Sequence, residues 1–409
     1  MDLIIRNARL SDRPNDTPPH DIGIENGRIV AIAPAITADA DVYDARGRLV
    51  CPGLIETHIH LDKSRVIDRC AHQPRATYSP VKGVTPLKPS MTVEDNYARA
   101  AATLEACIRH GATRMRTQVE VDPGIGMRGY EAIEQLAADY AWAIDVELCV
   151  FAQEGITNFP GTDELLVESL KRGAHLIGGA PRYDSDPMAQ IDRVFELARE
   201  YDVDIDMHLD VGTTPDGLLV HRVRELTDAF KRGGRVTVGH MAKLSLMPPA
   251  DVALLARQLA DSGVAVTVLP ATDLFLMGRD RDHAVPRGVA DANLLMDNGV
   301  TCSLSTNNVL NPATPFGDCS LIRIANMYAN LVQLDRPHQI EACFDMLTTQ
   351  SARLLGLKDY GLAVGHPADV VIVDATSRKQ AIAEIAQPVA AFKRGRQTMV
   401  WEPSKLLRP

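Results

Sequence analysis

The most constraining feature of the sequence is an apolar run, Val50 to Lys63, that is punctuated by Pro-Gly and closes on His58 and His60. Residues two apart in a strand point to the same face, so both imidazoles are expected to reach one point. His-x-His pairs are also common on surfaces. The preceding apolar residues and the following Asp62 and Lys63 favour a buried strand with polar chemistry at its mouth.

The middle of the chain, residues 53–354, alternates short β-rich runs with amphipathic stretches. Eight such units predict an all-parallel sheet, most simply a (β/α)8 barrel, with a doubly wound open sheet as the alternative. The expected strands are 53–58, 113–121, 145–152, 175–179, 203–208, 235–239, 264–269 and 301–305. The expected helices are 93–110, 130–140, 163–172, 188–200, 251–261 and 291–298.

Composition limits the classes of partner. The chain of 409 residues carries a formal charge of −10, which argues against nucleic-acid or acidic-membrane partners. It has no apolar run of about 18 residues and no signal-peptide pattern, so a cytoplasmic protein is expected. Its seven cysteines, scattered and odd in number, are expected to be reduced thiols. We expect a small-molecule substrate and a homo-oligomer.

Two further histidines end neighbouring predicted strands. The run 203–208 ends in His208, and the run 235–240 ends in His240. The carboxyl ends of consecutive parallel strands lie side by side, about 5 Å apart. With His58 and His60, these residues predict a cup of four histidines at one end of the barrel.

The segment Pro52 to Lys63 resembles the first-strand motif of the amidohydrolase superfamily, in particular its cytosine-deaminase branch. It is also similar to triazine-hydrolysing members that share His-x-His-x-Asp-Lys. The resemblance implies a small β-sandwich built from both termini, residues 1–52 and 355–409, beside a metal-dependent barrel at 53–354. It implies hydrolysis of a C–N bond.

The resemblance also assigns roles to the histidines. His58 and His60 correspond to two metal ligands of strand one, and His208 to the ligand of strand five. His240 corresponds to a strand-six histidine that either binds the metal or polarises the substrate. Asn307 stands where the family has an aspartate that is both ligand and proton shuttle. A carboxamide is a weaker ligand and holds no proton between steps.

Other positions depart from the cytosine-deaminase pattern. The branch's acidic residue three places after the strand-five histidine is Val211 here. Asp210 and Lys63 are therefore the candidate proton donors; strand alternation would place Asp210 on the face of His208. Gln118 replaces a histidine of strand two.

Gln153 matches the branch's glutamine that reads the amide edge of the pyrimidine. Gln118, Gln153 and Asn308 are the expected substrate-binding residues. The end of strand four, His175 to Pro181, has no lysine to bridge two metals, so one divalent metal is expected, with zinc ahead of iron or manganese.

The expected reaction is hydrolytic deamination of an amino-substituted heterocycle of pyrimidine, pterin or triazine type, by water that a metal activates. Two alternatives stay within this fold: hydrolysis of a cyclic or exocyclic amide, and a homologue that lost turnover and only binds ligand. A third alternative, a nucleotide-cofactor oxidoreductase, arises from Gly124 to Gly129, which matches the dinucleotide-binding pattern G-x-G-x-x-G, although this pattern is weak alone. If this segment does not bind a nucleotide, its Arg128 is free to meet a substrate carboxylate or carbonyl.

Overall fold

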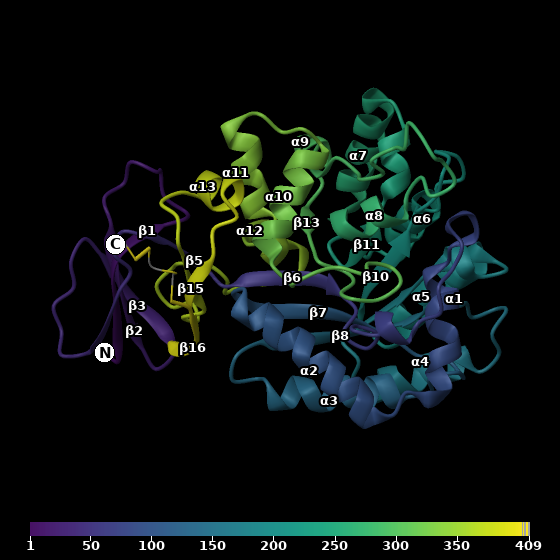
Figure 1. Ribbon diagram of the computed structural model, residues 1–409, viewed down its shortest axis with the longest axis horizontal. Coiled ribbons are helices and arrows are strands. Elements are labelled where there is room, and N and C mark those ends of the chain that lie inside the picture. Colours follow the sequence, from purple (N-terminus) through teal and green to yellow (C-terminus); the bar gives the residue numbers. More distant parts are fainter. Residues whose placement is uncertain (403, 405, 408–409) are drawn as a thin grey trace.

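A barrel and a smaller sheet built from the two ends of the chain make up the computed structural model, which describes residues 1–402, 404, 406 and 407 (Figure 1). The barrel strands pair in sequence order, and every pair is parallel. They are β6 (Leu54–Ile59), β7 (Ala112–Glu120), β8 (Asp145–Ala152), β9 (Leu176–Gly179), β10 (Asp204–Leu209), β11 (Val236–His240), β12 (Val264–Val268) and β13 (Cys302–Leu304).

Contacts of Asn307 close the sheet between its first and last strands. The backbone nitrogen of Asn307 donates to the carbonyl of His58 (3.0 Å), and the nitrogen of His60 donates to the carbonyl of Asn307 (2.8 Å). The Ser305 hydroxyl accepts from the His58 nitrogen (2.8 Å). The structure therefore confirms the (β/α)8 barrel and excludes the open doubly wound sheet.

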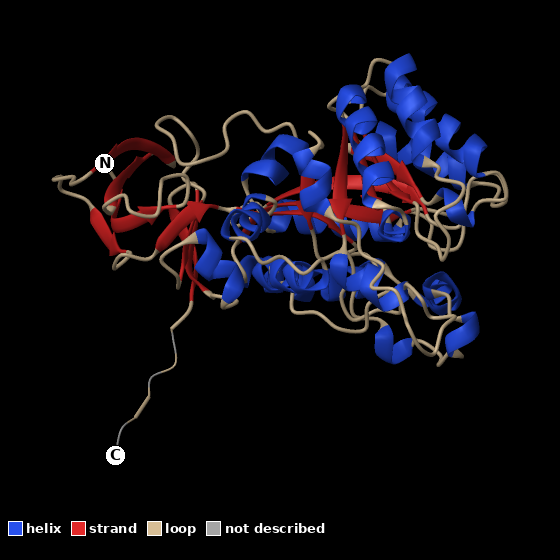
Figure 2. Cartoon of the chain, turned by 90° about the horizontal axis from the view of Figure 1, so that it is seen from above, coloured by secondary structure: helices blue, strands red, loops and turns tan. Residues whose placement is uncertain are grey.

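Helices surround the barrel strands (Figure 2). The six expected helices are present as α2 (Val93–Arg109), α3 (Arg128–Asp139), α4 (Thr162–Lys171), α5 (Pro187–Glu200), α7 (Pro249–Ser262) and α9 (Ala292–Asp297). Additional helices are α6 (Val220–Ala229), α8 (Pro270–Leu276), α10 (Leu321–Leu331), α11 (Pro337–Asp345) and α12 (Thr349–Leu354). Helix α6 was missed because its segment is polar overall, with apolar side chains only at Val220, Val223, Leu226 and Ala229 among charged residues.

The terminal sheet joins strands from both ends of the chain, which lie together in Figure 1. Its strands are β1 (Leu3–Leu10), β2 (His20–Glu25), β3 (Arg28–Ala33), β4 (Asp41–Asp44), β5 (Leu49–Pro52), β14 (Val370–Val373), β15 (Pro388–Lys393) and β16 (Arg396–Val400). Strand β5 is the link, because it pairs in parallel with β1 and antiparallel with β14. A separate apolar core, which includes Ile22 and Phe392, fills this unit.

A long connection, residues 60–92, joins the first barrel strand to α2. It contains η1 (Ile67–Arg69), η2 (Arg75–Thr77), α1 (Pro80–Val84) and η3 (Thr85–Ser90).

All seven cysteines are free thiols. Among the described residues, no helix combines the length and apolar character needed to cross a membrane.

A buried lysine fixes the terminal sheet to the barrel. The ammonium of Lys393, on β15, donates to the carboxylates of Asp145 (2.7 Å) and Asp369 (2.6 Å) and to the carbonyl of Thr113 (3.0 Å). Its side chain is only 1% exposed. The ion pair between Lys393 and Asp145 therefore links strand β15 of the terminal sheet to the start of barrel strand β8.

We predict that Lys393→Met lowers the free energy of unfolding by about 3–5 kcal/mol, because two carboxylates lose a buried partner. Urea denaturation followed by circular dichroism measures the change. Lys379→Met, which removes an exposed lysine that forms no ion pair with the described residues, is the matched control and should leave the midpoint unchanged. An equal effect of both substitutions would contradict the assigned role of Lys393.

Candidate active site

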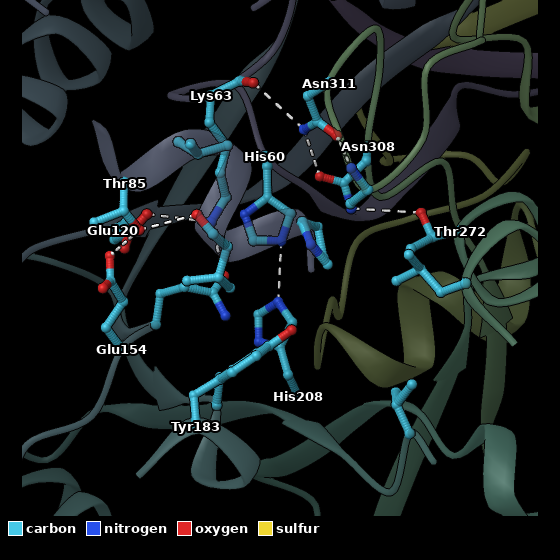
Figure 3. A pocket seen from close by; sticks show the side chains of 18 of the residues that line it. His60, Lys63, Thr85, Glu120, Glu154, Tyr183, His208, Thr272, Asn308 and Asn311 are labelled. Carbon is cyan, nitrogen blue, oxygen red and sulfur yellow. Dashed lines mark hydrogen bonds and ion pairs between the residues drawn. The ribbon is translucent and has the colours of Figure 1, made fainter. Parts of the chain in front are cut away.

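Three histidine side chains converge at the carboxyl end of the barrel. The Nε2 atom of His208 lies 3.2 Å from Nε2 of His58 and 3.0 Å from Nε2 of His60. His58 and His60 come from β6 and its end, and His208 comes from β10. Figure 3 shows the rings of His60 and His208 pointing toward each other. These nitrogens form a group that can hold a metal ion.

The electrostatics of these rings suit metal ligation. Burial lowers the pKa of His58 and lowers the pKa values of His60 and His208 well below the usual range, so all three rings are neutral. Nδ1 of His58 donates to the buried carboxylate of Asp206 (3.2 Å), which directs its Nε2 lone pair to the other rings. Arg116 donates in turn to Asp206 (3.3 Å).

Asn307 also fits a metal-binding site. Its side chain is fully buried, and neither its amide oxygen nor its amide nitrogen has a partner within the described part of the chain. A buried amide without partners is costly unless something else occupies its oxygen. The donor set is thus three neutral imidazoles with a carboxamide nearby, which suits one divalent transition metal.

His240 has a different partner from the other histidines. Its Nδ1 donates to Asp273 Oδ1 at 2.6 Å, and Asp273 lies on α8, fully buried. The His240 ring lies 5.5 Å from the His208 ring, centroid to centroid. In the neutral form of this ring, an Nδ1–H that donates to Asp273 leaves Nε2 as the hydrogen-bond acceptor. His240 lines the cavity, whereas Asp273 stands behind it.

A cavity opens above the histidines and has a polar wall on one side. Lys63 donates to Gln153 Oε1 (2.8 Å) and to Glu120 (3.3 Å). Lys88 donates to Glu120 and Asp122, each at 2.5 Å, and to Glu154. Glu120 and Glu154 lie on one side of His60 and His208 in Figure 3, and Asn308, Asn311 and Thr272 lie on the other.

The ammonium of Lys88 fills the space between three carboxylates. Burial opposes its charge, but Glu120 and Asp122 outweigh burial and raise the pKa of Lys88. For Glu120, Lys63 and Lys88 overcome burial and lower the pKa to about 2. Glu120, Asp122 and Glu154 have the spacing of a metal site, but a lysine already neutralises them. We therefore assign the metal to the histidines.

The segment of residues 62–91, which we call the lid segment, contributes Pro80, Val81 and Val84 to the cavity wall. Lys88 anchors its far end to the carboxylates described above. Arg128 anchors it as well, by donating to the carbonyls of Met91 (2.7 Å) and Lys88 (3.0 Å). The lid segment therefore forms part of the wall that encloses the cavity.

The cavity lining includes none of five residues singled out from the sequence, which are His58, Asn307, Asp210, Gln118 and Arg128. Asp210 follows the end of β10 with φ 53°, so strand alternation does not extend to it, and its carboxylate accepts from the nitrogens of Leu219 and Val220 at the start of α6. Its expected place on the His208 face is therefore wrong. Gln118 lies behind His58, 3.3 Å from Nδ1, rather than against a substrate. Arg128 binds backbone carbonyls, including that of Gly124.

The sequence also left some site residues unassigned. Asp273, Lys88, Glu120 and Glu154 carry no recognisable motif, although Glu120 and Glu154 follow the ends of strands as ligand-binding residues of barrels do. Asp206 was passed over because it lies inside a strand. A useful signal for Asp206 is its spacing of two from His208, which places both on one face.

A sequence profile described as amidohydrolase family matches residues 69–401. The chain belongs to the amidohydrolase family. It is 28% identical over 408 residues to N-isopropylammelide isopropyl amidohydrolase of Pseudomonas sp. (strain ADP), covering 97% of this chain and 96% of that protein. It is 26% identical to pterin deaminase of Rhizobium rhizogenes (strain K84 / ATCC BAA-868), covering 87% and 82% respectively.

A solved structure extends this likeness within the amidohydrolase family. The crystal structure of 5-methylcytosine deaminase from Klebsiella pneumoniae liganded with 5-fluorocytosine superposes with a TM-score of 0.92 at 28% identity, over 99% of each chain. The likeness covers both the barrel and the terminal sheet. The contacts of Gly124 to Gly129 do not favour the dinucleotide-binding alternative, because the nitrogens of Gly124 and Ile125 donate to Asp122 and the carbonyl of Gly124 accepts from Arg128.

We predict that His208→Ala lowers the affinity for a divalent metal by at least about 100-fold, because it removes the ring between the other two. Metal content measured by mass spectrometry on protein purified without chelators provides the test. His283→Ala removes a histidine that is 91% exposed and should leave the content at the wild-type level. Full metal content in the His208 variant would place the metal elsewhere.

Proposed function

We propose that the protein is a metal-dependent hydrolase that removes ammonia or an amine from an amino-substituted nitrogen heterocycle. The observation that carries this proposal is the convergence of three neutral imidazoles at the base of a cavity whose walls carry amide, ammonium and carboxylate groups. The names of the relatives describe deaminases of 5-methylcytosine and pterin and a hydrolase of N-isopropylammelide. Zinc is our first choice of metal, ahead of iron or manganese.

His58, His60 and His208 would hold a divalent metal, which would supply Lewis-acid activation of water near neutral pH. His240 is placed to act beside it. Its unprotonated Nε2 faces the cavity and takes a proton from water as the oxygen attacks the ring carbon, while Asp273 stabilises the resulting imidazolium. The protonated ring then donates to the substrate atom that gains negative charge, which is the ring nitrogen beside the attacked carbon of an amidine or the oxygen of an amide.

The leaving amine needs a proton, and Lys63 is the candidate that lines the cavity. Asp210 is committed to the start of α6 and cannot reach the same place without breaking two hydrogen bonds. Gln153 and Asn308 stay the proposed substrate-binding residues, because both line the cavity. Val84 and Leu276 provide apolar surface against which a flat ring can pack.

The test is amine release by protein reconstituted with zinc, manganese or ferrous iron, on a panel of cytosine, 5-methylcytosine, pterin and N-isopropylammelide. We predict release from at least one ring, falling to about 1% or less after chelation, because water loses its activation. Readdition of the metal should restore the rate. No release from any ring by metal-replete protein would reject the proposal.

Asn307 motivates a second candidate, a homologue that binds its ligand without turnover. A carboxamide cannot shuttle a proton as the family's aspartate does. The rest of the donor set favours catalysis, since His240 and Asp273 form an intact proton-accepting pair. Hydrolysis of a cyclic or exocyclic amide would use the same groups, and ring-opened products in the panel would identify it.

We predict that Asn307→Asp raises the rate on cytosine-like rings by about 100-fold if loss of the carboxylate limits deamination. Initial rates of ammonia release, with metal content measured in parallel, test this prediction. Asn298→Asp, a change of the same kind at the C-terminal end of α9, is the control. An unchanged rate at full metal content would mean that His240 and Asp273 already supply the proton path.

A further inference from the structure

A second cavity lies between helices α8 and α10 and borders the catalytic cavity. Its volume is about 340 Å³, which is within the range of small-molecule sites. Asn308 lines both cavities, whereas Thr272 lines only the catalytic one and Thr314 only the second. A hydrogen bond of 2.6 Å joins the two threonine hydroxyls, and Figure 3 shows Thr272 beside Asn308. These three side chains therefore form a wall between the two cavities.

Most of the lining of the second cavity is apolar. Helix α8 contributes Leu274 and Phe275, α10 contributes Met327, and the segment after β13 contributes Phe316. The rings of Phe275 and Phe316 meet edge to face, with centroids 6.4 Å apart. Phe316 is 67% exposed, so a ligand here would also cover apolar surface that now faces water. Such a lining favours a flat apolar ligand.

The charged part of the same lining is entirely cationic. It consists of Arg75, Arg279 and Arg323, and no acidic side chain of the described residues lines the cavity. Asp318 neutralises Arg323 through an ion pair of 2.8 Å. Arg75 donates to the carbonyls of Arg279 (3.2 Å) and Arg281 (2.7 Å), which carry no charge. The cavity therefore has an excess of positive charge in a chain whose formal charge is −10.

Arg279 is held in place by aromatic rings rather than by an anion. Its guanidinium carbon lies 4.0 Å from the ring centroid of Tyr78 and 4.7 Å from that of Phe275. Its Nη1 donates to the carbonyl of Phe275 (3.3 Å), and its buried Nε has no partner among the described residues. A guanidinium donates within its own plane, so the stacking leaves donors at its edge for a carboxylate.

We propose that this second cavity binds a small aromatic carboxylate, with its ring against Phe275 and Phe316 and its carboxylate on Arg279. The proposal goes beyond the proposed function, because the site is separate from the metal centre and does not depend on which heterocycle is hydrolysed. A carboxylate satisfies both the charge and the donors of Arg279. A neutral ligand of the same shape gains only the apolar contact.

The test uses two probes of the same shape, 2-naphthoate and the neutral 2-naphthamide. Calorimetry on zinc-loaded full-length protein measures the dissociation constant of each. We expect a dissociation constant below about 1 mM for 2-naphthoate and at least about tenfold weaker binding of 2-naphthamide, because only the carboxylate pairs with the guanidinium. Equal affinities, or no binding of 2-naphthoate at millimolar concentration, would overturn the proposal.

Two substitutions test where the probe binds. Arg279→Gln removes the guanidinium and should weaken 2-naphthoate at least about tenfold, while 2-naphthamide stays within about threefold of its wild-type affinity. Val285→Trp, at a lining position that is 43% exposed, fills part of the cavity and should weaken both probes. Arg281→Gln is the matched control, since it removes the same charge from an exposed neighbour that does not line the cavity. It should bind both probes as the wild type does.

A carboxylate can also bind a metal ion, so His208→Ala serves to separate the two sites. We expect 2-naphthoate to bind the His208→Ala protein as it binds the wild type, and to be weakened in Arg279→Gln. The opposite pattern would place the carboxylate at the metal and overturn the proposal. Binding of neither probe, with a changed mass of the Val285→Trp protein in light scattering, would assign the cavity to a second copy of the chain and overturn it as well.

Discussion

The structure depends on three buried imidazole nitrogens, in which Nε2 of His208 lies 3.2 Å from Nε2 of His58 and 3.0 Å from Nε2 of His60. Burial keeps the rings of His58, His60 and His208 neutral, so each Nε2 carries at most one hydrogen. His208 cannot donate from a single Nε2–H to both of its neighbours at full strength. A shared metal cation explains why the three nitrogens lie so close together, because all three lone pairs can then coordinate the same ion.

The barrel provides this geometry through its closure. The backbone of Asn307 hydrogen-bonds to that of His58 and His60, so the residue that joins the last strand to the first lies next to the two histidines of the first strand. Asp206 and Arg116 support His58 from within the barrel. Loss of the closure would therefore move two proposed ligands together with the strand that carries them.

The spacing of apolar residues and the positions of histidines at the ends of strands made the barrel and the histidine cluster predictable from the sequence. In a parallel barrel the carboxyl ends of all strands meet at one face, so His208 and His240 could be placed beside His58 and His60 from their positions alone. Contacts between segments far apart in sequence could not be predicted. Asp273 reaches His240 from a helix that propensity did not reveal, and Lys88 reaches Glu120 from a loop without regular periodicity. Asp210 was misplaced because its positive φ ends the strand pattern.

The most direct test of the metal centre is anomalous scattering from a crystal grown with zinc and recorded on both sides of the zinc absorption edge. The account predicts one strong peak about 2.0–2.1 Å from the Nε2 atoms of His58, His60 and His208. A peak among Glu120, Asp122 and Glu154 with Lys88 displaced, or rings turned away from one another around no peak, would contradict it.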